Sequence, residues 1–210
     1  MNEILDFFIK AYRETPTHLI VLEAIAFVFG IASVWYAKKE NILVYPTGII
    51  CTIITVYLLY INEYFGDMMM NFYYSVMSIY GWWNWSRKKD DEYIVPISRT
   101  NTKEKIIGIA LFLATMIVTY LVYRANNYDI QTPNYIDIFT SGIFFTAMWF
   151  MANKKLENWP LWIIANIITI PLYAYRGLGM LSLQYLIFTI LAIQGYNAWR
   201  TSLNKNLVTA

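Results

Sequence analysis

Polar and indole side chains recur along an apolar stretch at the spacing of one helix face. Within MNFYYSVMSIYGWWNW, five of them follow at steps of four, three, four and three residues: Asn71, Ser75, Ser78, Trp82 and Trp85. Residues three and four apart are neighbours on a helix, so these side chains share one face. Indole rings stack on flat ligands, and amides pair with hydroxyl or carboxamide groups. The stretch predicts a membrane helix that lines a site for a flat polar molecule.

Two later stretches carry the same kind of side chain. The first has Trp162, Asn166, Thr169 and Tyr173, and the second has Gln184, Thr189, Gln194, Tyr196, Asn197 and Trp199. An amide at mid-membrane is costly unless it is paired, so Asn71, Asn166 and Gln194 each need a partner. That partner is another helix or a substrate, since interhelical amides also join membrane helices. Trp83, Trp149 and Trp159 are assigned to the aromatic belt at the membrane surface.

The polar faces contain no cluster of Arg or Lys, so a phosphate would lack its usual partner. They suit a planar, hydroxylated molecule that is neutral or cationic. Enzyme chemistry finds little support, because the chain has one cysteine, Cys51, and one histidine, His18. Neither a Cys/His zinc site nor a Ser-His-Asp triad can be assembled from them. We expect no catalytic residue, metal or cofactor, and a packing role for Cys51.

Composition places these faces in a membrane. The 210 residues are 58% hydrophobic and 14% charged, with a mean hydropathy of +0.41. Apolar stretches of about 18–20 residues, long enough to cross a bilayer, recur along the chain. We therefore expect an all-α polytopic protein in a lipid bilayer, with no nucleic-acid partner. Seven transmembrane helices are predicted: Leu19–Ala37, Ile42–Ile61, Met68–Trp85, Ile106–Tyr123, Ile136–Met151, Trp159–Tyr175 and Leu178–Ala198.

The connections between these spans predict the orientation. Of the 16 Lys and Arg residues, 12 fall in connections on one side, which is cytoplasmic by the positive-inside rule. The N-terminus is then periplasmic and the C-terminus cytoplasmic. The expected segments are an amphipathic interfacial helix (1–17), a first three-helix bundle (18–86), a solvated cytoplasmic loop (87–105), a linker transmembrane helix (106–124), a second three-helix bundle (134–200) and a cytoplasmic tail (201–210).

The two bundles are related by an internal repeat. A shift of 114 residues gives 11 identities between Trp35 and Trp85 without a gap, and it superposes Trp35 on Trp149 and Pro46 on Pro160. Each repeat has three spans, and the single span between them gives both repeats the same orientation. This 3+1+3 parallel repeat is typical of the SWEET sugar transporters, whose site lies between the bundles near mid-membrane.

The motifs resemble one family of bacterial transporters. IYGWWNW at Ile79–Trp85, WPLWIIANIITIPLYAYRGLG at Trp159–Gly179 and ILAIQGYNAW at Ile190–Trp199 are similar to the PnuC carriers of nicotinamide riboside. This SWEET-related resemblance covers roughly Val34–Arg200. It implies a homotrimer in the bacterial inner membrane, with facilitated diffusion of the nucleoside by alternating access and trapping through a cytoplasmic kinase. Together with the helix faces, it assigns substrate binding to Asn71, Ser78, Trp82, Trp85, Trp162, Asn166, Tyr173, Gln194 and Trp199.

Three other functions remain open on the sequence alone. An ion-coupled symporter of a related vitamin such as thiamine could use Glu23 or Asp137, which the repeat superposes. A membrane enzyme is poorly supported, because no acid–base or nucleophile cluster lies at mid-depth. A purely structural membrane protein predicts no saturable binding of a small molecule.

Overall fold

The computed structural model describes residues 13, 15–61, 65–89, 92–93, 95–125, 130–175 and 179–209. Seven helices within these ranges confirm the predicted helical fold. Their bounds differ from the predicted ones by a few residues, except that the last helix runs on through the predicted tail. They are α2 (Thr17–Lys38), α3 (Val44–Ile61), α4 (Phe65–Ser86), α5 (Thr102–Ala125), α6 (Thr132–Ala152), α7 (Asn158–Tyr175) and α8 (Gly179–Thr209).

Within the described ranges, five of these helices are long and apolar enough to cross a membrane by that measure alone: α2, α3, α5, α6 and α8. The two others, α4 and α7, carry the polar and indole faces that include Asn71 and Asn166. Asparagine, serine and tryptophan lower the mean hydropathy of a helix. These two helices are among the three on which site residues were predicted, and the third is α8.

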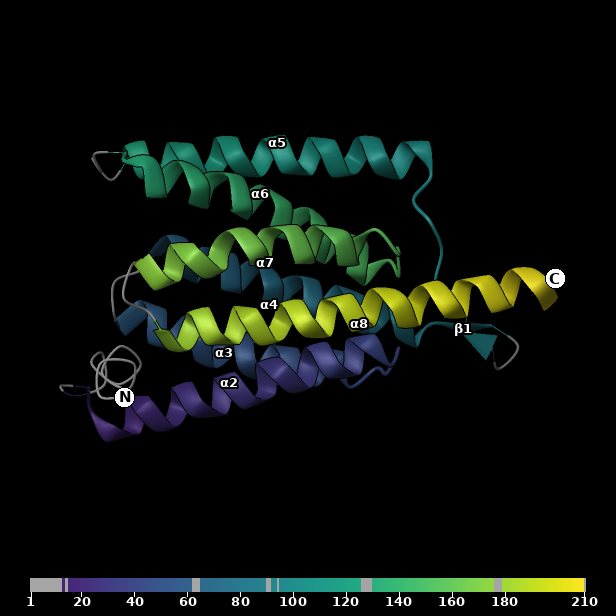
Figure 1. The fold of residues 1–210 in the computed structure, drawn as a ribbon, viewed down its shortest axis with the longest axis horizontal. Helices are drawn as coiled ribbons and strands as arrows, with labels where there is room; N and C mark the ends of the chain where they lie inside the picture. Colours follow the sequence, from purple (N-terminus) through teal and green to yellow (C-terminus); the bar gives the residue numbers. More distant parts are fainter. Residues whose placement is uncertain are drawn as a thin grey trace.

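Six helices form a closed ring, and the seventh lies outside it. Each of α2, α3, α4, α6, α7 and α8 packs against its two neighbours in that order, and α8 returns to α2. Helix α5 packs against α6 on the outside of the ring (Figure 1). All seven run side by side along the long axis, with the start of α2 at one end and the end of α8 at the other. We call these the N-terminal side and the turn side.

Local sequence explains where several helices begin. Helix α2 starts directly after Pro16. Asn101 precedes α5 and forms a reciprocal cap with Glu104, in which each side chain accepts a hydrogen bond from the other's backbone N–H at 2.9 and 2.8 Å. Gln131 and Asn134 form the same kind of cap before α6. Such caps satisfy N–H groups that have no partner within the helix.

The connection between α4 and α5 differs from the solvated loop that was predicted. Strands β1 (Lys88–Lys89) and β2 (Glu92–Tyr93) pair in antiparallel fashion, so the fold is not purely helical. Beyond them, residues 95–101 pack on the turn between α6 and α7. The N–H of Ser98 donates to the Lys154 carbonyl at 3.1 Å, and its carbonyl accepts from Leu156 at 2.9 Å. Burial of Ile97 in the core holds this strap in place.

The predicted amphipathic helix of residues 1–17 lies almost wholly outside the described residues.

Candidate functional site

Several buried polar atoms of helix α7 lack a hydrogen-bond partner in the described part of the chain, and two of them belong to Trp162 and Asn166. Asn166 is 2% exposed, and neither its Oδ1 nor the Nε1 of Trp162 has a hydrogen-bond partner in the described part of the chain. Thr169, on the same face, donates to the Ala165 carbonyl at 2.8 Å. Buried polar atoms are almost always hydrogen-bonded in native proteins. An unpaired acceptor and an unpaired donor one turn apart can therefore receive a polar ligand.

Aromatic rings from α4 and α6 lie beside Trp162, and rings from α8 and the end of α7 lie beyond them. The rings of Tyr74 on α4 and Phe144 on α6 lie 6.2 and 5.5 Å from it, measured between centroids. Tyr185 on α8 lies 5.9 Å from Phe144, and Tyr173 lies 5.3 Å from Tyr185. We call Tyr74, Phe144, Trp162 and Tyr185 the central aromatic group. Ring faces that converge in this way suit a flat ligand.

The polar residues of the first bundle are partly satisfied by one another. The hydroxyls of Thr52 on α3 and Ser75 on α4 share a hydrogen bond of 2.7 Å. Ser78 is buried between the same two helices, beside Gly48. Asn71 is half-buried, and its carbonyl accepts from Ser75 at 3.0 Å. The first bundle therefore offers small hydroxyl groups, whereas the second bundle offers Asn166 and Trp162.

A second aromatic cluster closes the ring at the turn side. It contains Tyr45, Trp85, Trp159 and Trp199, which we call the turn-side cluster. The rings of Tyr45 and Trp85 meet edge to face at 5.1 Å, as do those of Trp159 and Trp199 at 5.4 Å. Trp199 Nε1 donates to the Ala37 carbonyl at 3.0 Å.

The other polar atoms of the turn-side cluster have no hydrogen-bond partner among the described residues. They are the Tyr45 hydroxyl and the Nε1 atoms of Trp85 and Trp159. Trp162 packs against both this cluster and the central aromatic group. Rings with unpaired donors thus continue from the middle of the ring of helices to one end.

The structure brings together some of the predicted site residues and separates others. Trp162 belongs to the central aromatic group, Asn166 follows it by one turn of α7, and Tyr173 lies against Tyr185 of that group. Trp85 and Trp199 lie in the turn-side cluster. Trp82 is 43% exposed on the surface of the chain. Gln194 is also exposed and accepts a hydrogen bond of 2.7 Å from Lys38. Neither of these two side chains reaches the enclosed rings within one chain.

One assignment from the sequence is wrong. Trp159 was placed in the membrane-surface belt, but it is 1% exposed and packs inside the turn-side cluster. Sequence position gives the depth of a residue along a helix, but it does not say whether the side chain points outward or into the ring. Trp83, also assigned to the belt, is exposed.

Sequence reasoning also missed four aromatic residues: Tyr45, Tyr74, Phe144 and Tyr185. The repeat held a signal for one of them. Tyr45 and Trp159 both directly precede the superposed prolines, so an aromatic pair at these positions could have been read from the 114-residue shift. No pattern of that kind marks Phe144, whose helix α6 carries none of the predicted site residues.

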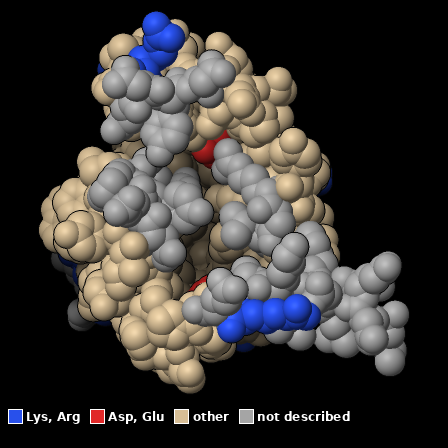
Figure 2. All heavy atoms as spheres, turned by 90° about the vertical axis from the view of Figure 1, so that its left-hand side faces the viewer, with Lys and Arg blue, Asp and Glu red and all other residues tan. Residues whose placement is uncertain are grey.

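The end of the ring on the N-terminal side is hollowed. Figure 2 looks onto this end and shows a depression between the helices, with acidic atoms at its edge. Glu23 of α2 and Asp137 of α6 lie in the halves of their helices on this side. The carboxylate of Asp137 accepts a hydrogen bond of 2.7 Å from the Tyr123 hydroxyl. In the described part of the chain, no three His, Cys, Asp or Glu side chains group so as to hold a metal ion.

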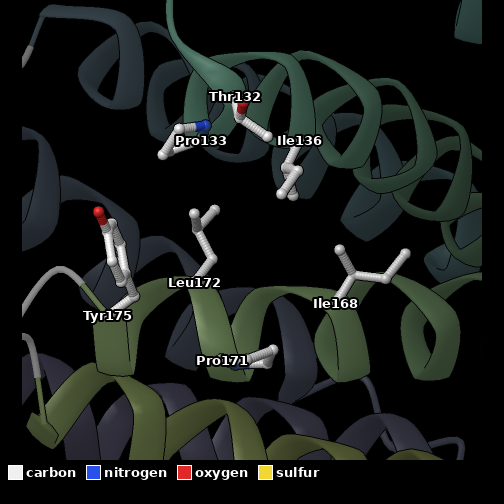
Figure 3. A pocket seen from close by; sticks show the side chains of 7 residues that line it. All are labelled: Thr132, Pro133, Ile136, Ile168, Pro171, Leu172 and Tyr175. Carbon is white, nitrogen blue, oxygen red and sulfur yellow. The ribbon is translucent and has the colours of Figure 1, made fainter.

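A pocket of about 340 Å³ opens between α6 and α7, away from the predicted site. Figure 3 shows its lining: Thr132, Pro133, Ile136, Ile168, Pro171, Leu172 and Tyr175. This lining is mainly hydrocarbon and contains none of the unpaired polar atoms. We therefore place the candidate site at the central aromatic group, where both ring faces and unpaired polar atoms are present.

Comparisons with known proteins find relatives over most of the chain. The nicotinamide riboside transporter PnuC of Escherichia coli is 22% identical over 204 residues, which cover 86% of this chain and 85% of that protein. PnuC of Neisseria mucosa is 26% identical, over 85% of this chain and 71% of that protein. The riboflavin/roseoflavin transporter RibM of Streptomyces davaonensis is 19% identical, over 90% and 89% respectively.

A crystal structure of the vitamin B3 transporter PnuC has the same fold. It superposes with a TM-score of 0.71 at 22% identity and covers 96% of this chain and 90% of that one. The sequence profile of the family described as nicotinamide mononucleotide transporter matches residues 20–201. The chain therefore belongs to this family, the PnuC transporters, and is a multi-pass membrane transporter and not an enzyme.

Proposed function

We propose that this protein carries nicotinamide riboside across the bacterial inner membrane by facilitated diffusion. The observation that carries the proposal is the pair of unpaired buried atoms, Asn166 Oδ1 and Trp162 Nε1, on a helix whose Trp162 ring lies beside Tyr74 of α4 and Phe144 of α6. The names of the PnuC relatives support the choice of substrate.

The chemistry of the ligand matches these groups one by one. Nicotinamide riboside has a cationic pyridinium ring, a carboxamide and a ribose. The ring stacks within the central aromatic group and gains cation–π attraction there. Asn166 Oδ1 accepts from the carboxamide N–H or a ribose hydroxyl, and Trp162 Nε1 donates to an oxygen of the ligand.

The riboside fits better than its phosphate. The family description names the mononucleotide, which carries a phosphate. Phosphates are usually bound by Arg or Lys, and the central aromatic group and Asn166 include neither. Competition between the riboside and the mononucleotide for the purified protein tests this preference directly.

We further propose that the two bundles are parallel repeats that rock about the site to give alternating access. Several features support this. The bounds of α3 and α7 differ by 114 residues at both ends, and exchange of the two bundles maps the ring of packed helices onto itself. Glu40 and Lys154, also 114 residues apart, both have left-handed backbone conformations, with φ of 52° and 50°.

The remaining parts of the proposal concern the setting of the site. The basic residues gather at the turn side, which supports a cytoplasmic C-terminus and a periplasmic N-terminus. The homotrimer and the trapping of the substrate by a cytoplasmic kinase come from the family resemblance alone. A trimer would give exposed aromatic residues such as Trp82 a further surface to contact. Cross-linking of purified protein would report the number of subunits.

Binding of nicotinamide riboside to purified protein is the direct test. Eight tryptophans, several of them in the two clusters, should report binding through fluorescence quenching. We expect saturable binding that thiamine and riboflavin displace only weakly. Displacement by either vitamin as readily as by the riboside would redirect the substrate assignment, and no saturable binding of any of them would refute it.

An ion-coupled symporter is the second candidate, because acidic atoms edge the hollow on the N-terminal side (Figure 2). The Tyr123 hydroxyl already holds one carboxylate oxygen of Asp137, which favours a structural role for that acid. Uptake into proteoliposomes separates the two. With the membrane potential clamped, facilitated diffusion predicts equal rates with and without a proton or sodium gradient, and coupling predicts stimulation by one of them.

A further inference from the structure

The turns between α2 and α3 and between α6 and α7 meet at the turn side through an ion pair. Lys154 Nζ lies 3.4 Å from Glu40 Oε2. Glu40 belongs to the first bundle's turn and Lys154 to the second's. The Ser202 hydroxyl on α8 donates to the other carboxylate oxygen of Glu40 at 3.2 Å. The pair therefore joins the two bundles at one end of the ring.

Lys154 is an unusual member of such a pair because it is only 7% exposed. A buried ammonium group is costly unless other groups compensate its charge. Glu40 supplies one compensation. The second is the ring face of Trp85, whose centroid lies 4.7 Å from Lys154 Nζ. The lysine thus holds a cation against the face of a buried indole.

Trp85 has features of a ligand-binding residue as well. It is 2% exposed, and its Nε1 has no partner in the described part of the chain. Its equivalent in the second bundle, Trp199, donates to the Ala37 carbonyl. Trp162 packs against the cluster that contains Trp85, so a ligand that leaves the central aromatic group toward the turn side next meets this indole.

We propose that Lys154 is a tethered cation that keeps the turn side closed, and that the cationic ring of the substrate displaces it from Trp85. The inference rests on the proposed function and deepens it. One indole face binds one cation at close range. When the pyridinium takes that face, Lys154 loses one of its two compensating partners, and the ion pair with Glu40 weakens. Binding of the substrate is thereby coupled to opening of this end.

The coupling predicts a dependence on ligand charge that a purely structural ion pair would not give. The reduced form, dihydronicotinamide riboside, has nearly the same shape but an uncharged ring. In Lys154→Met the cationic nucleoside no longer competes with the lysine. The ratio of its affinity to that of the reduced form should rise by about 5- to 30-fold, from the strength of a cation–π contact.

Matched variants separate charge from folding. Lys154→Arg keeps a cation and should keep the ratio. Lys155→Met removes the neighbouring lysine, which pairs with Glu104 at 2.7 Å, and it should leave the ratio unchanged. If Lys154→Met does not fold, the exchange of Glu40 and Lys154 in a double variant restores an ion pair but moves the cation away from Trp85. That variant should show the raised ratio too.

Opening of the turn side is measured by cysteine labelling. Ala192 is buried in the core at this end, so Ala192→Cys in a Cys51→Ala background should react slowly with a hydrophilic thiol reagent. The cationic nucleoside should speed the reaction, and the reduced form should not. Lys154→Met should react rapidly without any ligand.

The inference is overturned if both nucleosides accelerate labelling equally. It is also overturned if Lys154→Met keeps an unchanged affinity ratio and still reacts slowly. In either case, binding of the nucleosides still upholds the proposed function. If neither nucleoside binds, the proposed function and the inference both fall.

Discussion

Replacement of Asn166 by leucine separates binding from folding. In the free protein, Asn166 Oδ1 is a buried acceptor without a partner in the described residues. Its removal therefore breaks no hydrogen bond at that atom and exposes no new cavity, so the thermal midpoint should stay the same or rise. In the complex, the ligand group that faced Oδ1 loses its acceptor, which costs about 1–3 kcal/mol. Affinity for nicotinamide riboside should fall by about 5- to 150-fold.

Titration calorimetry and thermal unfolding of the same preparation measure the two effects together. Thr169→Val is the matched control, because the threonine hydroxyl donates to the Ala165 carbonyl of its own helix and not to the ligand. The affinity of this variant for the riboside should therefore stay within about twofold of the wild-type value. A lower thermal midpoint with unchanged affinity in Asn166→Leu would mean that Asn166 joins helices and binds no substrate, and the location of the site would be refuted.

Three other outcomes follow from the packing and the hydrogen bonds. Alanine at Gly81 or Gly195 would put a Cβ within 2.4 or 2.5 Å of a ring atom, so each should lower unfolding stability by about 1–3 kcal/mol in thermal melts. Trp199→Phe loses the hydrogen bond to the Ala37 carbonyl, so it should lower unfolding stability by about 1 kcal/mol more than Trp85→Phe does. Trp85→Phe should instead weaken binding of the riboside. Uptake should be independent of ion gradients both in the wild-type protein and in Asp137→Asn. If a gradient stimulates the wild-type protein but not Asp137→Asn, the symporter is favoured.

Hydropathy and helix periodicity predicted the seven helices, because each turns an apolar surface to lipid or to its neighbours. They also placed polar faces on α4 and α7, the two helices that fall short of the hydropathy of the rest. The position of Asn166 followed from this pattern, since an amide on a Trp/Tyr face of a membrane helix needs an interior partner.

Other features depended on contacts between segments far apart in the chain. Trp159 lies at the start of α7 and Gln194 lies midway along α8, level with the end of α2, yet one is buried and the other reaches Lys38. Their direction is set by which neighbour each helix meets, and the sequence gives only their depth. The strap of residues 95–101 looked like a solvated loop because charges surround it, and only its contact with the turn after α6 gives Ile97 a place to be buried.

That strap has a mechanical consequence. Through Ser98 it is bonded to the turn that follows α6, and α5 packs along α6 as well. Helix α5 is thus held to the second bundle by its packing on α6 and by the strap that precedes it. Its chain connection to the first bundle runs through the short β1–β2 hairpin. If the two halves pivot, α5 should ride with α6 and α7. Spin labels on the outward-facing residues Ile109 of α5 and Val28 of α2 would then report, through the distance between them, how far the two bundles move during transport.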